Sequence, residues 1–358
     1  MLFDSWFGPH DSSLGNGSWL NYPQNSPLGQ EYLINDSGNV SPVYGSIGPS
    51  TTTEHTTSTN SSPPAPTLIG SPNGLEIDLV WDSSVAKAPS GFMQAIIAAA
   101  TYYTTLFSNK EVINIDVGYG EIDGSSMASD ALGESESYGY LTNYATVTHA
   151  LSEDGYSFSA ANEPTTSQFF VNSADAKALG LINPTSTAVD GFVGFSTLSG
   201  TGDSWNYTAG ATASNSGTGP TQFDLQAVAE HEISEVMGRI GMEGATVDRK
   251  PTDTPLDLFN YKSPGVLELS ANGGYFSVNG GTTNLGVYNN ASANGGDIAD
   301  WASITSITQS HTQGLPNGDY DAYDAFAGPG YNGALSQSDI LEDAALGYTL
   351  TSAGVAAA

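Results

Sequence analysis

The sequence predicts an α/β fold in which a twisted mixed sheet packs against helices and is followed by a β-rich, loop-heavy C-terminal part. Three observations predict it. Strand-like and helix-like segments alternate between residues 75 and 120, an amphipathic helical pattern covers residues 222–240, and glycine-rich hairpin signals follow it. With 358 residues, of which 39% are apolar, the chain is long enough to bury a core of this kind.

The first 70 residues show no helical or strand period. Ser, Thr, Asn, Gly and Pro dominate, most densely in STTTEHTTSTNSSPPAPT at 50–67. Such a segment cannot bury enough apolar surface to offset the entropy lost on ordering. We therefore expect residues 1–70 to form a disordered arm and residues 71–352 to form one folded domain.

A strand–helix–strand unit opens that domain. LEIDLVWD, from Leu75, alternates apolar and polar residues as a half-buried strand does. Ser90 is a suitable N-cap for GFMQAIIAAATYYTTLF, which is rich in good helix formers, and VINIDVGYG at 112–120 predicts the second strand. A helix at 138–150 and a short apolar strand at 191–196 are expected next.

The second half contains a helix at 222–240, a turn at 251–265 and β-rich sequence at 266–352. VLELSANGGYFSVNGGTTNLGVYN contains NGG twice between alternating segments, which is a strong hairpin signal. SQSDILEDAAL at 336–346 predicts a short helix near the C-terminal end. Because no fixed period recurs along the chain, a repeat architecture is not expected.

The composition favours divalent cations as partners. The 38 acidic side chains outnumber 7 Lys and Arg and give a net charge of -31, which repels nucleic-acid phosphates and anionic lipid headgroups. No stretch approaches the ~20 apolar residues needed to span a bilayer, so membrane insertion is not expected. Acidic side chains among 42 glycines offer flexible oxygen ligands of the kind calcium prefers, and we expect structural calcium.

The absence of cysteine excludes disulfides, thiolate catalysis and cysteine-bound zinc, so any metal must be held by His, Asp, Glu or Tyr. Residues 1–15 have neither a basic region nor a long apolar run, and so no classical export signal. The composition nevertheless resembles that of bacterial proteins exported through one-step secretion systems. A secreted, extracellular location is therefore expected, while the oligomeric state is not indicated.

The helix at 222–240 carries the most specific chemistry. His231 and Glu235 lie four residues apart on one face, and Glu232 lies about 100° round from His231. In the H-E-x-x-H signature two imidazoles hold zinc and the intervening glutamate takes a proton from water. A carboxylate is also a zinc ligand, so H-E-x-x-E predicts zinc on His231 and Glu235, with Glu232 as general base.

Two ordinary interpretations compete with this one. Glu235 precedes Arg239 by four residues, the favoured order for a helical ion pair, and His231 could be an ordinary helix histidine. If the site is functional, Arg239 is instead expected to orient Glu235. Four of the seven cationic residues fall between 239 and 262, where they could neutralise buried acids or hold a substrate carboxylate.

This helix resembles that of a known family. HEISEVMGRIG is similar to the metzincin pattern H-E-x-x-H-x-x-G-x-x-H, with Gly238 at the glycine and with Glu235 and Gly241 at two ligand positions. PLDLFNY at 255–261 lies where serralysin-like enzymes place their Met-turn, with Phe259 replacing the methionine. With the preceding strands and helix and the terminal SQSDILEDAALGYTL, about residues 75–350 are similar to secreted bacterial matrixin- and serralysin-like metalloproteases.

The resemblance implies a zincin-like fold and a zinc endopeptidase that acts on proteins or peptides, with Tyr261 at the turn tyrosine steadying the oxyanion. Because Gly241 cannot coordinate, a third ligand must come from elsewhere. Asp257 is our first choice, and Tyr261, Glu243 and Asp248 are the other candidates. Alternatively, Asp257 caps a turn after Pro255, and Tyr261 packs in the core.

Two other segments suggest calcium. NGDYDAYDAFAGPG contains Asp319, Asp321 and Asp324, and NGGDIADW contains Asp297 and Asp300. Both resemble calcium loops without matching the full twelve-residue pattern, and such clusters also arise by chance in so acidic a chain. Two non-enzymatic functions therefore remain: a degenerate zincin kept as a matrix or adhesive protein, and a calcium-dependent extracellular binding module.

Overall fold

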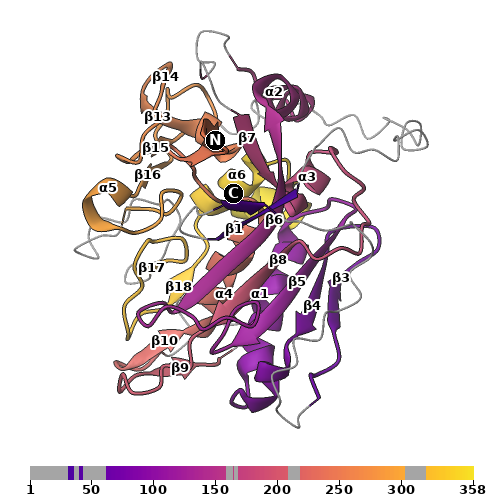
Figure 1. Ribbon diagram of the computed structural model, residues 1–358, viewed down its shortest axis with the longest axis vertical. Coiled ribbons are helices and arrows are strands. Elements are labelled where there is room, and N and C mark those ends of the chain that lie inside the picture. The colour runs from indigo at the N-terminus through magenta and orange to yellow at the C-terminus, as the bar shows by residue number, and fades with distance from the viewer. Residues whose placement is uncertain are drawn as a thin grey trace.

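The computed structural model describes residues 31–35, 40–42, 62–158, 164, 168–208, 218–302 and 320–358. In these parts the chain is a mixed α/β protein with a mixed central sheet and seven helices (Figure 1). The α/β class predicted from the sequence is confirmed. Among the described helices, none is both long and apolar enough to cross a membrane.

The central sheet has the strand order β11-β12-β7-β6-β8-β5-β4-β3. These strands are β3 (Thr67–Gly70), β4 (Glu76–Trp81), β5 (Val112–Tyr119), β6 (Gly133–Asn143), β7 (Gln168–Asn172), β8 (Gly191–Phe195), β11 (Thr246–Val247) and β12 (Lys250–Asp253). Strands β4, β5 and β8 are mutually parallel, whereas β6 runs antiparallel to both β7 and β8. Strands β7 and β8 therefore point the same way, and β6 runs against both of them.

The segment assigned to a disordered arm contributes to this sheet. β1 (Glu31–Asn35) pairs antiparallel with β6, β2 (Val40–Pro42) pairs with β1, and β3 also lies before residue 71. Tyr32 and Ile34 alternate with partly buried neighbours and pack in one apolar cluster with Phe170. The prediction was wrong for these strands, because β1 is stabilised by the edge of the distant strand β6, β2 by pairing with β1, and β3 by pairing with β4. Most of the remaining arm residues lie outside the described ranges.

The strand–helix–strand unit forms β4, α1 (Phe92–Leu106) and β5, much as predicted. Helix α1 begins one residue later than expected, after Gly91, whose φ of 100° favours glycine. The helix expected at 138–150 was wrong in its first half. Strand β6 continues to Asn143, whose side chain accepts a hydrogen bond from the Thr146 N–H and begins α2 (Tyr144–Glu153).

Helix α4 (Leu225–Met237) is shorter than the predicted helix at 222–240. Residues Gln222–Asp224 instead form β10, parallel to β9 (Ser204–Asn206). The helix ends at Gly238, where a φ of 125° is open to glycine alone. Helices α1 and α4 pack together beneath the sheet, and α4 also contacts β6 and β8 (Figure 1).

The C-terminal part supplies short elements beside α4. Its strands are β13 (Asn260–Ser263), β14 (Val266–Leu267), β15 (Gly274–Phe276), β16 (Gly286–Tyr288), β17 (Tyr320–Asp321) and β18 (Gly333–Ala334), and its helices are α5 (Ala291–Asn294), α6 (Gln337–Ala345) and α7 (Ser352–Ala357). Helix α3 (Ser173–Ala178) and the 3-10 turns η2 (Ser83–Lys87) and η5 (Leu256–Phe259) complete the described elements. The predicted hairpin forms as β15–β16, and the predicted terminal helix is α6, with a capping box at Ser336.

Candidate metal centre

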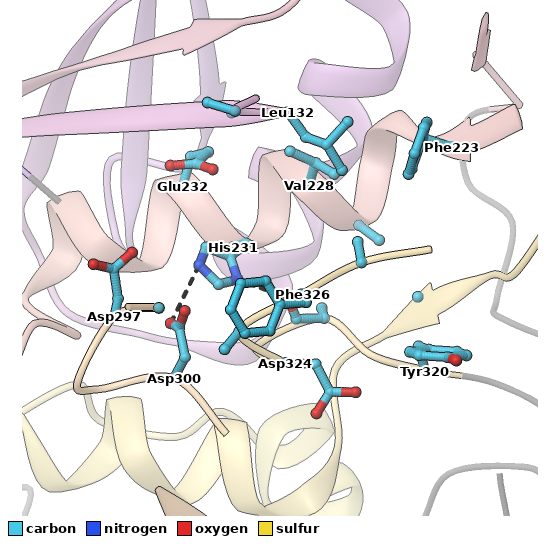
Figure 2. Close-up of a pocket in the computed structure, with 18 of the residues that line it drawn as sticks. Leu132, Phe223, Val228, His231, Glu232, Asp297, Asp300, Tyr320, Asp324 and Phe326 are labelled. Carbon is cyan, nitrogen blue, oxygen red and sulfur yellow. Dashed lines mark hydrogen bonds and ion pairs between the residues drawn. The ribbon is translucent and has the colours of Figure 1, made fainter. Parts of the chain in front are cut away.

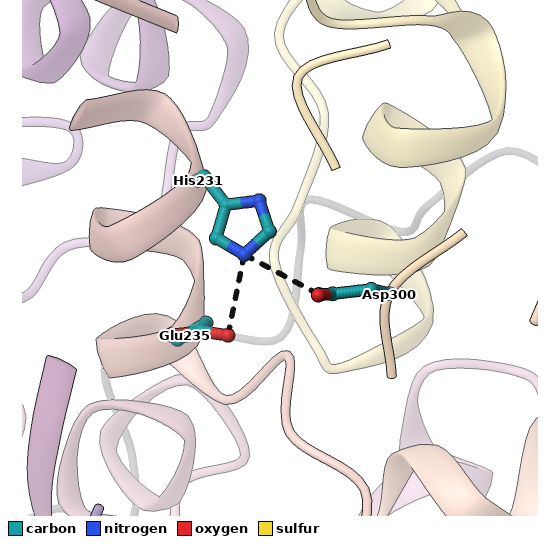
Figure 3. A group of neighbouring side chains, drawn as sticks. All are labelled: His231, Glu235 and Asp300. Carbon is teal, nitrogen blue, oxygen red and sulfur yellow. Dashed lines mark ion pairs between the residues drawn. The ribbon is translucent and has the colours of Figure 1, made fainter. Parts of the chain in front are cut away.

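Three side chains form a group that could hold a metal ion: His231, Glu235 and Asp300 (Figure 3). Their ligand atoms all lie within 4.8 Å of one another. His231 Nε2 lies 3.4 Å from Glu235 Oε1 and 3.3 Å from Asp300 Oδ1. Helix α4 supplies the first two residues, and the loop after α5 supplies Asp300. The carboxylates are buried, and the imidazole is 14% exposed.

The backbone next to β17 fixes the orientation of the imidazole. His231 Nδ1 lies 2.8 Å from the carbonyl oxygen of Ala322. Because a carbonyl oxygen only accepts hydrogen bonds, Nδ1 must carry the proton. In the neutral ring Nε2 then presents its lone pair to the two carboxylates, which is the arrangement of a metal-ligating histidine.

Further side chains hold the two carboxylates in place. Ser135, on β6, donates a hydrogen bond of 2.7 Å to Glu235 Oε2, which leaves Oε1 facing His231. Arg239 is completely buried, donates from Nη1 to Asp300 Oδ1 at 2.7 Å, and lies 3.6 Å from Glu235 through Nη2. Its guanidinium lies 4.0 Å from the centre of the Tyr323 ring. Arg239 thus contacts both carboxylates of the group.

The charges of the group are mutually dependent. Burial alone would raise the pKa of Asp300, but His231 and Arg239 lower it to about 2. Burial alone would lower the pKa of His231, but Asp300 and the hydrogen bonds to both carboxylates raise it well above the ordinary value. Nε2 is the imidazole atom that takes up the second proton, and it is also the atom that would bind a metal ion. A proton and a metal ion therefore compete for Nε2.

The spacing of the group fits a small divalent cation. Zinc binds nitrogen and carboxylate oxygen at about 2.0–2.2 Å with tetrahedral angles, which places its ligand atoms about 3.4 Å apart. The two distances from Nε2, 3.4 and 3.3 Å, match that separation. The hydrogen bonds from Ser135 and Arg239 are the supporting contacts that metal ligands usually have. One histidine and two carboxylates therefore form a ligand set that zinc accepts.

A cavity of 440 Å³ opens beside the group (Figure 2). Its wall is formed by the segment entering β6, by α4 and by the loops at 295–300 and 320–333. Glu232 lies on this wall next to His231 and is nearly buried. A Cβ atom on Gly133 would lie 2.2 Å from Glu232 Oε1, so only glycine leaves room for this carboxylate. No sequence pattern indicated a role for Gly133.

The structure does not bring Asp257 to this group, and Asp300 takes the place predicted for it. Asp257 is buried in η5, where Oδ2 accepts hydrogen bonds from the N–H groups of Met242 at 3.1 Å and Thr254 at 2.7 Å. Asp257 therefore caps the turn at Pro255, as in the alternative interpretation of the sequence. The other candidates also have different partners: Glu243 accepts from Asn260, and Asp248 accepts from Tyr32.

Tyr261 is not on the wall of the cavity either. It lies in β13, nearly buried, with its ring 6.5 Å from that of Tyr275. It lines a separate cavity of 180 Å³ together with Tyr144 and Leu258. The prediction that Tyr261 steadies an oxyanion is thus not compatible with this arrangement, and its alternative as a packed aromatic residue holds.

The two segments expected to bind calcium meet at the same cavity. Asp297 and Asp300 line it from one loop, and Asp321 and Asp324 line it from the other. Asp319 lies outside the described residues. Among the described residues, His231, Glu235 and Asp300 are the one set of three or more such side chains whose ligand atoms lie within 4.8 Å of one another. Sequence reasoning marked Asp300 as a cation ligand but could not connect it to a histidine 69 residues away.

No protein-family model, curated protein or solved structure matches this chain. The resemblance of α4 to the metzincin helix therefore rests on the motif alone. The geometry of the site is a separate argument that these side chains could hold a metal ion, because it depends on Asp300, Ser135 and Gly133, none of which belongs to the motif.

Proposed function

We propose that the chain is a zinc-dependent endopeptidase, with zinc held by His231, Glu235 and Asp300 and with Glu232 as general base. The observation that carries the proposal is the position of this three-ligand group on the wall of a 440 Å³ cavity that Glu232 also lines. The H-E pair on α4 and its similarity to the metzincin helix support the same assignment. A secreted location and structural calcium are part of the proposal and are supported by composition.

In this proposal some residues transfer protons and others hold the metal ligands in place. When bound, zinc would supply Lewis acidity that polarises a carbonyl oxygen and makes water more acidic. Glu232 accepts a proton from the attacking water at its carboxylate and then delivers it to the leaving amine. The imidazole of His231 is held by the Ala322 carbonyl, and Arg239 holds Asp300, so the ligands need little rearrangement.

The edge of β6 offers a place for an extended peptide. Strand β1 pairs with β6 from Glu136 to Tyr140, while β8 pairs with the opposite edge of residues 133–137. In the described structure the outer edge of Gly133 to Ser135 is therefore not covered by a strand, and Gly133 and Glu134 line the cavity. A substrate strand added at this edge would lie beside Glu232.

The test is metal content by mass spectrometry on protein purified without chelator, followed by a peptidase assay. We expect about one zinc per chain in the wild type, loss of zinc in His231→Ala, and retained zinc without hydrolysis in Glu232→Gln. Calcium alone, unchanged in both variants, would contradict the proposal and favour the calcium-dependent binding module.

A further inference from the structure

The cavity wall is strongly acidic beyond the three proposed ligands. Apart from these and Glu232, six acidic side chains line it: Asp130, Glu134, Asp224, Asp297, Asp321 and Asp324. No lysine or arginine is among its lining residues. A bound dication together with Arg239, which contacts Glu235 and Asp300, would exceed the charge of these two carboxylates by one, so the other acids still leave the wall negative when the metal is present.

One of these acids has an oxygen with no partner. Asp324 is 8% exposed, and its Oδ2 atom accepts no hydrogen bond within the described structure. Burying an ionised carboxylate in this way is costly, and burial beside Asp321 and Asp300 raises the pKa of Asp324 to about 8, so the group keeps a proton at neutral pH unless a cation reaches it. No three of these six acids bring their carboxylate oxygens within 4.8 Å of one another. A longer organic cation with several donors fits their spacing better than a second metal ion does.

Aromatic side chains lie among these acids. Phe326 lines the cavity and is 49% exposed, which is unusual for phenylalanine (Figure 2). Tyr320 and Tyr331 also line it, with ring centroids 4.5 Å apart. Lysine and arginine combine an apolar stem, which packs on such rings, with a cationic head that is attracted to ring faces and carboxylates.

We propose that this cavity selects peptides that carry an arginine or lysine side chain close to the bond that is cut. The claim that such peptides are cleaved rests on the zinc peptidase function proposed above. The claim that they bind preferentially depends only on the residues that line the cavity. The negative charge of the whole chain, -31, adds to the attraction of cationic peptides before they bind.

Matched peptides test the preference. Three fluorogenic peptides would differ at one position, which holds arginine, its neutral isostere citrulline, or glutamate, and that position is moved along the peptide. We expect kcat/KM to be about tenfold higher or more for arginine than for citrulline at one position or more, and lowest for glutamate. The ratio should fall as salt is added. Equal rates for arginine and citrulline at every position would overturn the proposal.

Variants locate the preference on the wall. Asp324→Asn should reduce the arginine-to-citrulline ratio several-fold, and Phe326→Ala, at an exposed position where folding is not at risk, should reduce it less. Glu153→Gln removes an equal charge from an exposed site at the end of α2, outside the cavity, and should leave the ratio unchanged. Ratios that stay at the wild-type value in both wall variants would contradict the assignment.

Binding separates this proposal from the peptidase function. The Glu232→Gln variant would be titrated by calorimetry with the arginine and citrulline peptides. Preferential binding of the arginine peptide to this variant, together with a wild-type protein that cleaves none of the peptides, would uphold the wall's preference and reject the peptidase. Hydrolysis without discrimination would uphold the peptidase and reject the preference. Equal binding of the two peptides, or binding of neither, would reject the preference.

Discussion

Two groups of buried carboxylates lie near the end of α4, and they differ in whether a cation faces them. In the ligand group, Glu235 and Asp300 lie against His231 and Arg239, and the pKa of Asp300 is lowered to about 2. In the turn group, Glu243 and Asp257 lie beside each other and near Asp253, and among the described residues no cationic side chain forms an ion pair with Glu243 or Asp257. Burial and the charge of Asp253 raise the pKa of Glu243 to about 7, and burial with the charges of Glu243 and Asp253 raises the pKa of Asp257 well above its ordinary value.

The comparison shows what makes a buried acid available to a metal. A carboxylate that faces a buried cation stays ionised and keeps an oxygen directed at the imidazole. A carboxylate that faces other carboxylates retains a proton and serves as a hydrogen-bonding group, as Asp257 does for the backbone of Met242 and Thr254. The same residue type therefore has different chemistry in two neighbouring loops.

The largest expected effect comes from removing the cation of the ligand group. Arg239→Met leaves Asp300 and Glu235 buried without their counter-charge, and we expect a loss of about 3–5 kcal/mol in the free energy of unfolding. Urea denaturation of the metal-free protein measures it. The control is Lys262→Met, which removes an exposed cation and should change little. Equal stability of Arg239→Met and the wild type would show that the ligand group does not depend on Arg239.

The turn group should make the free energy of unfolding depend on pH through a raised pKa, in contrast to the lowered pKa of Asp300 in the ligand group. The pKa of Glu243 is higher in the folded chain, about 7, than its ordinary value of 4.5, so the folded state holds the proton more tightly. This contribution is fully present below about pH 4.5 and is lost as the pH rises through about 7. Glu243→Gln should match the wild type at pH 4 and be more stable at pH 8, by about 3 kcal/mol.

Urea unfolding at pH 4, 6 and 8 measures this difference between variant and wild type. Glu153→Gln, in which an exposed carboxylate is removed, is the control and should show no such change with pH. If Glu243→Gln were less stable than the wild type at pH 8, Glu243 would be ionised in the fold and the contrast between the groups would fail.

A third effect concerns the carboxylate next to the ligand group. In Gly133→Ala the added Cβ would lie 2.2 Å from Glu232 Oε1, so Glu232 must move. We expect kcat to fall about 100-fold, the scale of general-base catalysis, while metal content is kept. Gly74→Ala, whose Cβ would meet ordinary contacts near 3.9 Å, is the control. Full activity in Gly133→Ala would exclude Glu232 as the base.

The smallest effect should come from Ser135→Ala, which removes the hydrogen bond to Glu235 Oε2. Loss of such a supporting contact weakens metal affinity by about tenfold or somewhat more. Competition with a chelator measures the affinity, and Ser137→Ala, a buried serine two residues along β6, is the control. An unchanged affinity in Ser135→Ala would show that Glu235 needs no support from β6.

Sequence patterns predicted what depends on short-range spacing. The alternation in β4, the apolar periodicity of α4 and the four-residue interval from His231 to Glu235 are all properties of contiguous segments. The third member of the ligand group is not, because Asp300 reaches it through the tertiary fold. In so acidic a chain, Asp257 and Asp300 look equivalent until their neighbours are known. The strand β1 was missed for the same reason, since its partner β6 lies about 100 residues later.

The most direct test is the metal content of Asp300→Asn compared with that of Asp257→Asn, each purified without chelator. We predict that the wild type and Asp257→Asn carry about one zinc ion per chain and that Asp300→Asn loses it. Zinc retained in Asp300→Asn and lost in Asp257→Asn would contradict the assignment of the ligand group, as would a wild-type protein that binds no zinc.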